Sequence, residues 1–269
     1  MRRVSNGITV AIAVALLAGA AQAAPPRGPL SKCPVDAIVA GAACMDKYEA
    51  SVWRVPNPKT VNQLLVGRIR RGTATAADLA AGGATHLGVV QTDDYAPCAD
   101  SGQNCADDIY AVSLPGVMPS ANLTWFQAEV ACTNAGKRLP SNAEWQAAVV
   151  GTPDPGPDDE TTDCNTQSTM AVATGSRSAC VSSFGAFDMV GNLTEFVADW
   201  VPPNTTCGSW TPGLSGTDLN CLLGAAQTGE PRVLTRGGHF LHGPLAGPLT
   251  VIPAPPSFAL DTIGFRCAR

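Results

Sequence analysis

The sequence lacks long basic runs, long apolar runs and C-x-x-C pairs, and each absence excludes a class of function. The 269-residue chain has a formal net charge of −5, and no run of Lys and Arg is longer than Arg70-Arg71. We therefore expect no nucleic-acid partner, because such binding depends on clustered positive charge. No segment approaches the roughly 18 uninterrupted apolar residues of a membrane-spanning helix. The sequence thus predicts no stable membrane anchor.

The start of the chain has the composition of a secretory signal peptide. Arginines at positions 2 and 3 precede an apolar run over residues 8–17, and a small-residue A-Q-A site ends at Ala23. This order is typical of a cleavable signal peptide. We expect residues 1–23 to be removed and residues 24–269 to form a single domain. The protein is then exported to the periplasm or to the extracellular medium.

Ten cysteines follow this leader. An even number of cysteines in an exported chain most simply forms a set of disulfides. The absence of any C-x-x-C pair weighs against a cysteine metal site. Counting alone does not fix the pairing, but spacing favours neighbours. The favoured pairs are Cys33 with Cys44, Cys98 with Cys105, Cys164 with Cys180 and Cys207 with Cys221, which leaves Cys132 with Cys267.

Helical signals are few and lie in the first 150 residues. Capping residues and glycine stops mark four short helices. These are residues 61–71, ended by Gly72; a helix capped by Thr75 and running through Leu79; a helix opened by Thr124 and Gln127 and stopped by Gly136; and a helix opened by Ser141 and Glu144 and ended by Gly151. Beyond them only short strands are indicated, such as residues 233–234 and 263–265. We expect little regular structure, with much of the domain held by its bridges.

Five sequence blocks follow one another along the chain. They are C-M-D-K-Y-E-A-S at residues 44–51, T-W-F-Q-A-E-V-A-C-T-N-A-G-K-R-L-P-S-N-A-E-W-Q-A-A at 124–148, F-G-A-F-D-M-V-G-N-L-T-E-F-V-A-D-W at 184–200, R-G-G-H-F at 236–240 and I-G-F-R-C-A-R at 263–269. Together they resemble the formylglycine-generating enzyme, or sulfatase-modifying factor, family. The resemblance implies an α+β domain with a variant of the C-type-lectin-like fold. It also implies a bridge between Cys132 and Cys267.

The reactive motif of that family is altered in this chain. Enzymes that make formylglycine resemble one another in a motif R-G-G-S-x-x-C, followed five residues on by a second Cys, and the two thiols hold copper(I). Here His239 stands at the Ser position, His242 at the first Cys and Gly247 at the second. Gly243 and Ala246 replace the Arg and Tyr that usually lie between them. We therefore expect a divergent member without formylglycine-generating activity.

Two functions from different classes remain for the segment around His239 and His242. The first is a binding module, in which both histidines line a cleft for a peptide, glycan or protein partner. The alternative is a metal-dependent oxidoreductase, in which the two residues are catalytic and bind Cu or Fe in place of the cysteine pair, because neutral imidazoles ligate such metals. Two histidines are an incomplete ligand set, and no motif links His86, the third, to them. The binding module is therefore favoured.

The segment V-G-N-L-T-E, at residues 190–195, is a second candidate site. A similar segment contributes a calcium site in the family, and hard oxygen ligands suit Ca²⁺. The alternative places Asn192 in a turn and pairs Glu195 with a buried arginine, Arg236 or Arg266. The calcium ligands implied by the resemblance are the side chains of Asn192 and Glu195 and the carbonyl oxygens of Val190 and Leu193.

Overall fold

A computed structural model describes residues 32–90, 94–105, 108–154, 158–201, 206–209, 219–223 and 231–269, with only the backbone described at 206–209 and 219–223. The predicted signal peptide lies outside these residues. The predicted pair Cys207 and Cys221 lies outside the described side chains. No helix in the described part of the chain is long and apolar enough to span a membrane.

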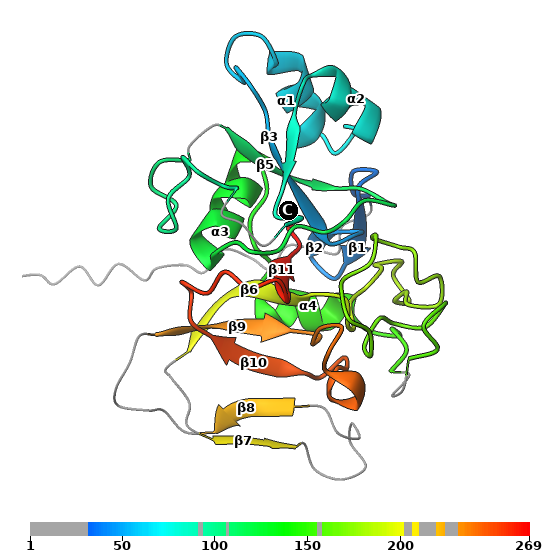
Figure 1. Ribbon diagram of the computed structural model, residues 1–269. Helices are drawn as coiled ribbons and strands as arrows, with labels where there is room; N and C mark the ends of the chain where they lie inside the picture. Colours follow the sequence, from blue (N-terminus) through cyan, green and yellow to red (C-terminus); the bar gives the residue numbers. More distant parts are fainter. Residues whose placement is uncertain are drawn as a thin grey trace, which may run out of the picture.

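The N-terminal half builds two small antiparallel sheets (Figure 1). Strands β1 (Ala37–Ala40) and β2 (Ala43–Asp46) form a hairpin. The second sheet has the order β4-β3-β5. Its strands are β3 (Ala50–Arg54), β4 (Thr85–Leu87) and β5 (Ile109–Ser113). Helices α1 (Gln63–Arg70) and α2 (Ala76–Ala81) lie between β3 and β4 in sequence and at one end of the molecule.

Local capping chemistry fixes where the helices begin. Helices α2, α3 (Trp125–Asn134) and α4 (Asn142–Ala148) each start with a capping box, in which a hydroxyl accepts from the third helical N–H and that residue's side chain bonds back. The caps are Thr75, Thr124 and Ser141, as predicted. After α3, Gly136 turns the chain at φ +71°. The predicted helices are confirmed, although α1 begins two residues later than expected and α2 continues past Leu79.

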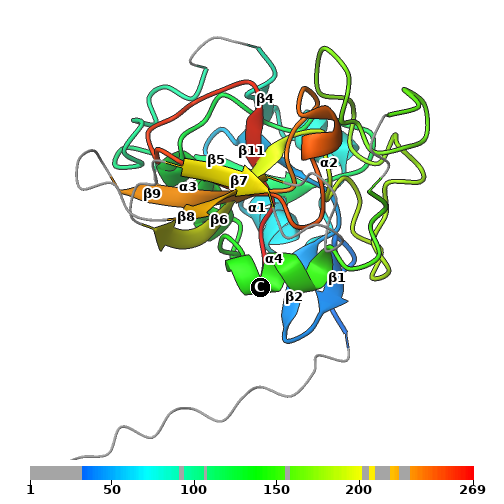
Figure 2. The same ribbon diagram turned by 90° about the horizontal axis from the view of Figure 1, so that it is seen from below.

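The C-terminal half supplies a six-stranded mixed sheet in the order β11-β6-β9-β10-β8-β7. Strands β6 and β11 are parallel, with Ile263 opposite Thr194, and β6 and β9 are antiparallel, with Glu195 opposite Arg236. Helix α4 packs against this sheet and the β1–β2 hairpin (Figure 2). The strands are β6 (Thr194–Val201), β7 (Thr206–Ser209), β8 (Leu219–Leu223), β9 (Arg232–Arg236), β10 (Val251–Ala254) and β11 (Ile263–Phe265).

Buried apolar side chains and disulfides join the two halves. One cluster includes Leu123, Phe196 and Phe265, and a second gathers around Trp145 and Val197. The structure contains four of the predicted bridges, Cys33–Cys44, Cys98–Cys105, Cys132–Cys267 and Cys164–Cys180. Short helices, short strands and long bridged connections confirm the predicted α+β class with little regular structure.

Candidate functional site

Two glycines after β9 turn the chain away from the sheet and begin the candidate site. Gly237 and Gly238 adopt φ of +83° and +77°, a region that side chains with a Cβ rarely enter. A Cβ on Gly237 would also lie 2.6 Å from the carbonyl oxygen of Met189. This geometry explains the R-G-G motif. It delivers His239 and His242 to a tight turn that leads into the short 3₁₀ helix η1 (Gly243–Leu245).

The two imidazoles lie against each other and are fixed by the backbone of their own turn. Their ring centroids are 3.7 Å apart, with planes tilted by 38°. Nδ1 of His242 accepts from the backbone N–H of His239 at 3.0 Å. Nδ1 of His239 accepts from the backbone N–H of Leu241 at 3.2 Å. Both Nδ1 atoms therefore use their lone pairs within the turn.

This arrangement sets the protonation of both rings. Burial, and next the neighbouring His242, lower the pKa of His239 to about 4, and burial also lowers the pKa of His242. Both rings are therefore neutral near pH 7. A neutral imidazole that accepts at Nδ1 carries its proton on Nε2. Each ring thus presents an N–H donor, and neither has a free lone pair for a metal.

A metal site at this position also lacks further ligands. No group of three or more His, Cys, Asp or Glu side chains that could hold a metal occurs in the described part of the chain. The two histidines named from the sequence lie together, because their rings are in contact. His86 lies elsewhere, stacked on Trp53 with 4.6 Å between ring centroids.

Two cavities open on either side of His242, which lines both. The larger, of about 670 Å³, has both polar and apolar residues in its lining and lies between the 240–244 segment and the loop that precedes β6. The smaller, of about 200 Å³, lies along β10 and the connection from β10 to β11, and His239 also lines it. The lining of the larger cavity includes Ser168, Thr169, Arg177 and Leu241. The histidine pair therefore sits in a wall shared by two cavities.

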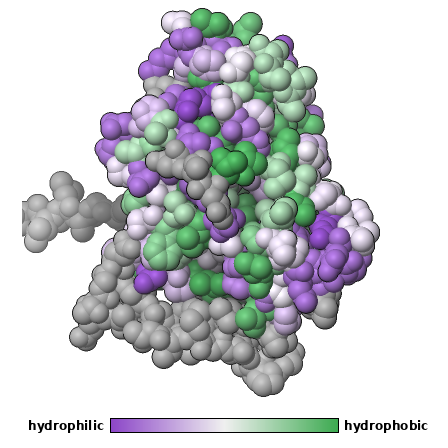
Figure 3. Space-filling view, in the orientation of Figure 1, coloured by the Kyte–Doolittle hydropathy of each residue, from purple (hydrophilic) through white to green (hydrophobic). Residues whose placement is uncertain are grey.

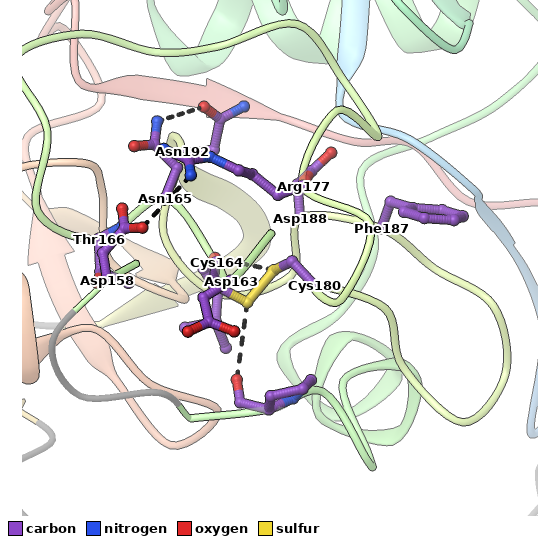
Figure 4. Close-up of a disulfide and its surroundings, with 12 residues drawn as sticks. Asp158, Asp163, Cys164, Asn165, Thr166, Arg177, Cys180, Phe187, Asp188 and Asn192 are labelled. Atoms are coloured by element: carbon purple, nitrogen blue, oxygen red, sulfur yellow. Dashed lines mark hydrogen bonds and ion pairs between the residues drawn. A yellow bond between two sulfur atoms is a disulfide. The ribbon is translucent and has the colours of Figure 1, made fainter. Parts of the chain in front are cut away.

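The wall of the larger cavity opposite the histidines is a loop closed by the Cys164–Cys180 disulfide (Figure 4). Arg177 lies three residues before Cys180 and reaches toward Asp158, with 3.4 Å between Nη1 and the carboxylate. The Asp158 carboxylate also accepts from the backbone N–H of Thr166. Figure 3 shows hydrophilic residues gathered over these loops between α4 and β6. The larger cavity therefore has a polar, covalently closed wall.

Comparison with known proteins identifies the family of the chain. A family model described as "Sulfatase-modifying factor enzyme 1-like domain" matches residues 85–269. The chain belongs to this family. The described part of the chain has the α+β class that the resemblance implied. No curated protein matches the sequence significantly.

Solved structures are similar to this sulfatase-modifying factor domain at low identity. The Major Tropism Determinant M1 variant is 18% identical, with 90% of this chain and 54% of that chain covered and a TM-score of 0.46. CarF is 15% identical, with 84% and 85% covered and a TM-score of 0.42. PvdO from Pseudomonas aeruginosa is 18% identical, with 84% and 80% covered and a TM-score of 0.40. The chain spans about half the length of the tropism determinant.

Two of the calcium ligands that the resemblance implies, the side chains of Asn192 and Glu195, are bonded to protein groups. Oδ1 of Asn192 accepts from Asn165 Nδ2 at 3.0 Å and from the backbone N–H of Val172 at 2.8 Å. The carboxylate of Glu195 accepts from the Arg266 guanidinium at 2.6–2.9 Å and from Trp145 Nε1 at 2.7 Å. Asn192 also has a positive φ of 56°, as expected for a turn. These protein groups compete with calcium for both side chains.

Asp188, which the sequence interpretation missed, has a carboxylate oxygen without a hydrogen-bond partner among the described residues. Asp188 is buried, and its Oδ1 has no hydrogen-bond partner among the residues that the structure describes. Burial raises the pKa of Asp188 to about 7, and burial together with Asp188 and Glu195 raises the pKa of Glu49 well above its usual range. The buried acids around Arg266 thus outnumber it, and protons or a cation must compensate them. The calcium prediction stays a prediction, with Asp188 as the ligand to test.

The melting temperature should depend on pH because of these acids. Since the pKa of Asp188 rises from 3.8 to about 7 on folding, the folded protein binds more protons than the unfolded chain between these pH values. Stability should therefore fall as pH rises from about 4 to about 7, on the order of 4 kcal/mol if Asp188 acts alone. Thermal unfolding in EGTA should show this slope, and Asp188→Asn should reduce it to the part that Glu49 contributes.

Measuring the melting temperature with added calcium shows whether protons or a metal ion compensate the charge of these carboxylates. If calcium compensates the charge, adding it at pH 7.5 raises the melting temperature of the wild type and not of Asp188→Asn. A wild-type melting temperature that calcium leaves unchanged would remove the calcium prediction. A melting temperature independent of pH in EGTA would contradict the raised pKa of Asp188.

Proposed function

We propose that this protein is an exported binding module of the sulfatase-modifying factor family. It binds a peptide, glycan or protein partner through the cleft around His239 and His242, and it does not generate formylglycine. One observation carries the proposal: both Nδ1 atoms accept backbone N–H groups within the turn, so the neutral rings offer Nε2–H donors rather than metal ligands. The chain also has no cysteine in the segment 236–247 where the family's thiols would stand.

The family's oxidative chemistry fits these residues poorly. Copper(I) prefers soft thiolates, and the eight cysteines whose side chains are described are all in disulfides. For either imidazole to ligate a metal through Nε2, its proton would have to move to Nδ1 and the backbone hydrogen bond to Nδ1 would break. Burial opposes the charged form of both rings. The segment is therefore better suited to donating hydrogen bonds to a ligand oxygen.

Variants of the histidines test whether they donate hydrogen bonds or bind metal. Peptide and glycan arrays are probed with the wild type, His239→Ala/His242→Ala and His239→Gln/His242→Gln. Since each neutral hydrogen bond contributes about 1 kcal/mol, the alanine pair should lose about tenfold or more in affinity for array hits. Glutamine places an N–H near the position of Nε2 and should retain much of the binding. His86→Ala is the matched control, because His86 lies outside both cavities.

Oxygen uptake and metal titration distinguish the binding module from the alternative, a metal-dependent oxidoreductase. With a cysteine-containing peptide and added Cu(I) or Fe(II), we expect no oxygen consumption above that of the alanine pair. Isothermal titration with either metal should give the same result for the two proteins. Oxygen consumption that is lost in both histidine variants, glutamine included, would establish the oxidoreductase and overturn the proposal. Array binding that is indifferent to the alanine pair would also overturn it.

A further inference from the structure

The smaller cavity beside the histidines has apolar walls. It lies along β10 and the connection from β10 to β11, and its volume is about 200 Å³. Phe258 and Leu260 at its rim remain 44% and 43% exposed, although both are large apolar side chains. The remaining apolar walls come from Ile252, Pro253, Pro255 and Ile263. Such a cavity favours a compact, largely apolar group that carries a polar atom, because Thr194, Arg232, Thr262 and the two histidines line it beside the apolar side chains.

One part of the cavity lining is polar. Thr194 lines the cavity and is only 3% exposed, yet its Oγ1 has no hydrogen-bond partner among the described residues. The register places Thr194 opposite Ile263 and directly before Glu195, which pairs with Arg236 at the end of β9. Thr194 therefore lies beside the turn that carries His239. The hydroxyl of Thr235 is different, because it already donates to the carbonyl of Ile252 at 2.9 Å.

The size and the polar groups together define the ligand. An apolar cavity of roughly 150 Å³ accommodates benzene, so 200 Å³ holds a six-membered ring with one substituent. A buried hydroxyl without a partner is unfavourable, and a ligand atom that bonds Thr194 Oγ1 would satisfy it. The imidazole N–H groups require an acceptor. A phenolic oxygen satisfies all of these groups, because its proton can go to Thr194 while its lone pairs accept from the imidazoles.

We propose that this cavity binds a phenolic ring, either a tyrosine side chain of a peptide or a small free phenol. The inference rests on the proposed function, since it names the ligand class of the same cleft. For a peptide, His242 would stand between the bound ring and the larger cavity, where Ser168 and Thr169 can bond the flanking main chain. A free phenol needs the smaller cavity only.

Matched ring probes test the proposal with the full protein. Binding of p-cresol, toluene, N-acetyltyrosinamide and a glycyl-tyrosyl-glycine peptide is measured by ligand-observed NMR titration. We expect p-cresol to bind about fivefold more tightly than toluene, the ratio that about 1 kcal/mol of hydrogen bonding produces. Tighter binding of the peptide than of p-cresol would indicate a tyrosine ligand. Binding of p-cresol without binding of either tyrosine probe would indicate a free phenol.

Cavity variants locate the bound ring. Thr194→Val keeps the shape of the side chain, removes Oγ1 and should reduce the preference for p-cresol over toluene severalfold. Ile252→Trp fills the cavity and should abolish binding of both probes. Leu64→Ala is the control, because Leu64 lies on α1, is 82% exposed and lines neither cavity. Melting temperatures confirm that each variant is folded, and Thr194→Val supplies the decisive result if Ile252→Trp does not fold.

Failure of this inference differs from failure of the proposed function. Equal affinity for p-cresol and toluene, or no affinity for either, would overturn the phenolic ligand. An unchanged preference for p-cresol in Thr194→Val would overturn the role of the Thr194 hydroxyl in binding. In both cases array binding that depends on His239 and His242 would leave the proposed function intact. Conversely, p-cresol binding that requires Thr194 together with array binding indifferent to the histidines would overturn only the proposed function.

Discussion

Replacing Arg266 with methionine should destabilise the protein by roughly 3–5 kcal/mol, the range observed when one partner of a buried ion pair is removed. Arg266 is fully buried, and its guanidinium holds the carboxylate of Glu195 through Nε and Nη2. The same group donates to the carbonyls of Asp46 and Phe187. The substitution leaves these acceptors, and the neighbouring acid Asp188, without a cation. Urea unfolding at pH 7 measures the loss.

Arg138→Met is the matched control for this prediction. Arg138 also pairs with a glutamate, Glu144, at 2.6 Å, but their side chains are 47% and 25% exposed. Exposed ion pairs contribute about 0–1 kcal/mol, because water screens the charges. We expect the free energy of unfolding of Arg138→Met to lie within about 1 kcal/mol of the wild-type value. Similar losses of stability in the two variants would show that burial does not increase the contribution of Arg266 to the free energy of unfolding. Glu195→Gln alone should also be destabilising, because it leaves Arg266 buried beside a neutral partner.

The helices could be predicted because their signals are local. The hydroxyls of Thr75, Thr124 and Ser141 bond within three residues of themselves, so the sequence contains both partners of each cap. Strand β6 shows the opposite case. Its first four residues are all buried, which removes the alternation of apolar and polar residues that reveals a strand with one solvated face. Strand β6, second from one edge of the large sheet, therefore had no periodic signal.

The candidate site was located from the sequence, but its chemistry depended on the fold. The motif singled out His239 and His242. The choice between metal ligand and hydrogen-bond donor, in contrast, follows from which ring nitrogen accepts a backbone N–H of the turn. Sheet register brings Thr194 next to Ile263, about 70 residues away in the chain, and so creates the polar part of the small cavity. Nothing in the sequence around Thr194 indicates this neighbour.

The direction of the side chains, rather than the strand register, decides which arginine pairs with Glu195. Arg236 lies directly opposite Glu195 in the β6–β9 pairing. Its guanidinium nevertheless packs 4.6 Å from the ring of Trp145 and bonds the carbonyl of Thr250. Arg266, which follows β11, reaches the carboxylate instead. The sequence left both arginines open because Arg236 ends β9 and Arg266 follows β11, so each adjoins buried strand residues. Only the direction of the side chains separates them.

The disulfide between Cys132 and Cys267 should be the most stabilising bridge whose bond the structure describes. It joins α3 to the chain after β11 and closes a loop with a sequence separation of 135 residues. In the chain-entropy treatment, a loop of this length stabilises the folded state by about 5 kcal/mol, chiefly by restricting the unfolded chain. Removing it through Cys132→Ala/Cys267→Ala should therefore lower the free energy of unfolding by about that amount. Alanine avoids placing hydroxyls where both cysteines are fully buried.

The Cys33–Cys44 bridge provides the comparison, because its sequence separation is only 11 residues. The same treatment gives it about 3 kcal/mol, so Cys33→Ala/Cys44→Ala should be the more stable double variant by about 2 kcal/mol. The comparison is well matched in space, since Cys44 exchanges backbone hydrogen bonds with Arg269, two residues beyond Cys267. Both variants are measured by urea unfolding under non-reducing conditions. Equal losses would show that native contacts around the sulfurs, rather than loop closure, determine the contribution of each bridge. A reversed order would show that the long Cys132–Cys267 loop is not the main covalent restraint on the unfolded chain.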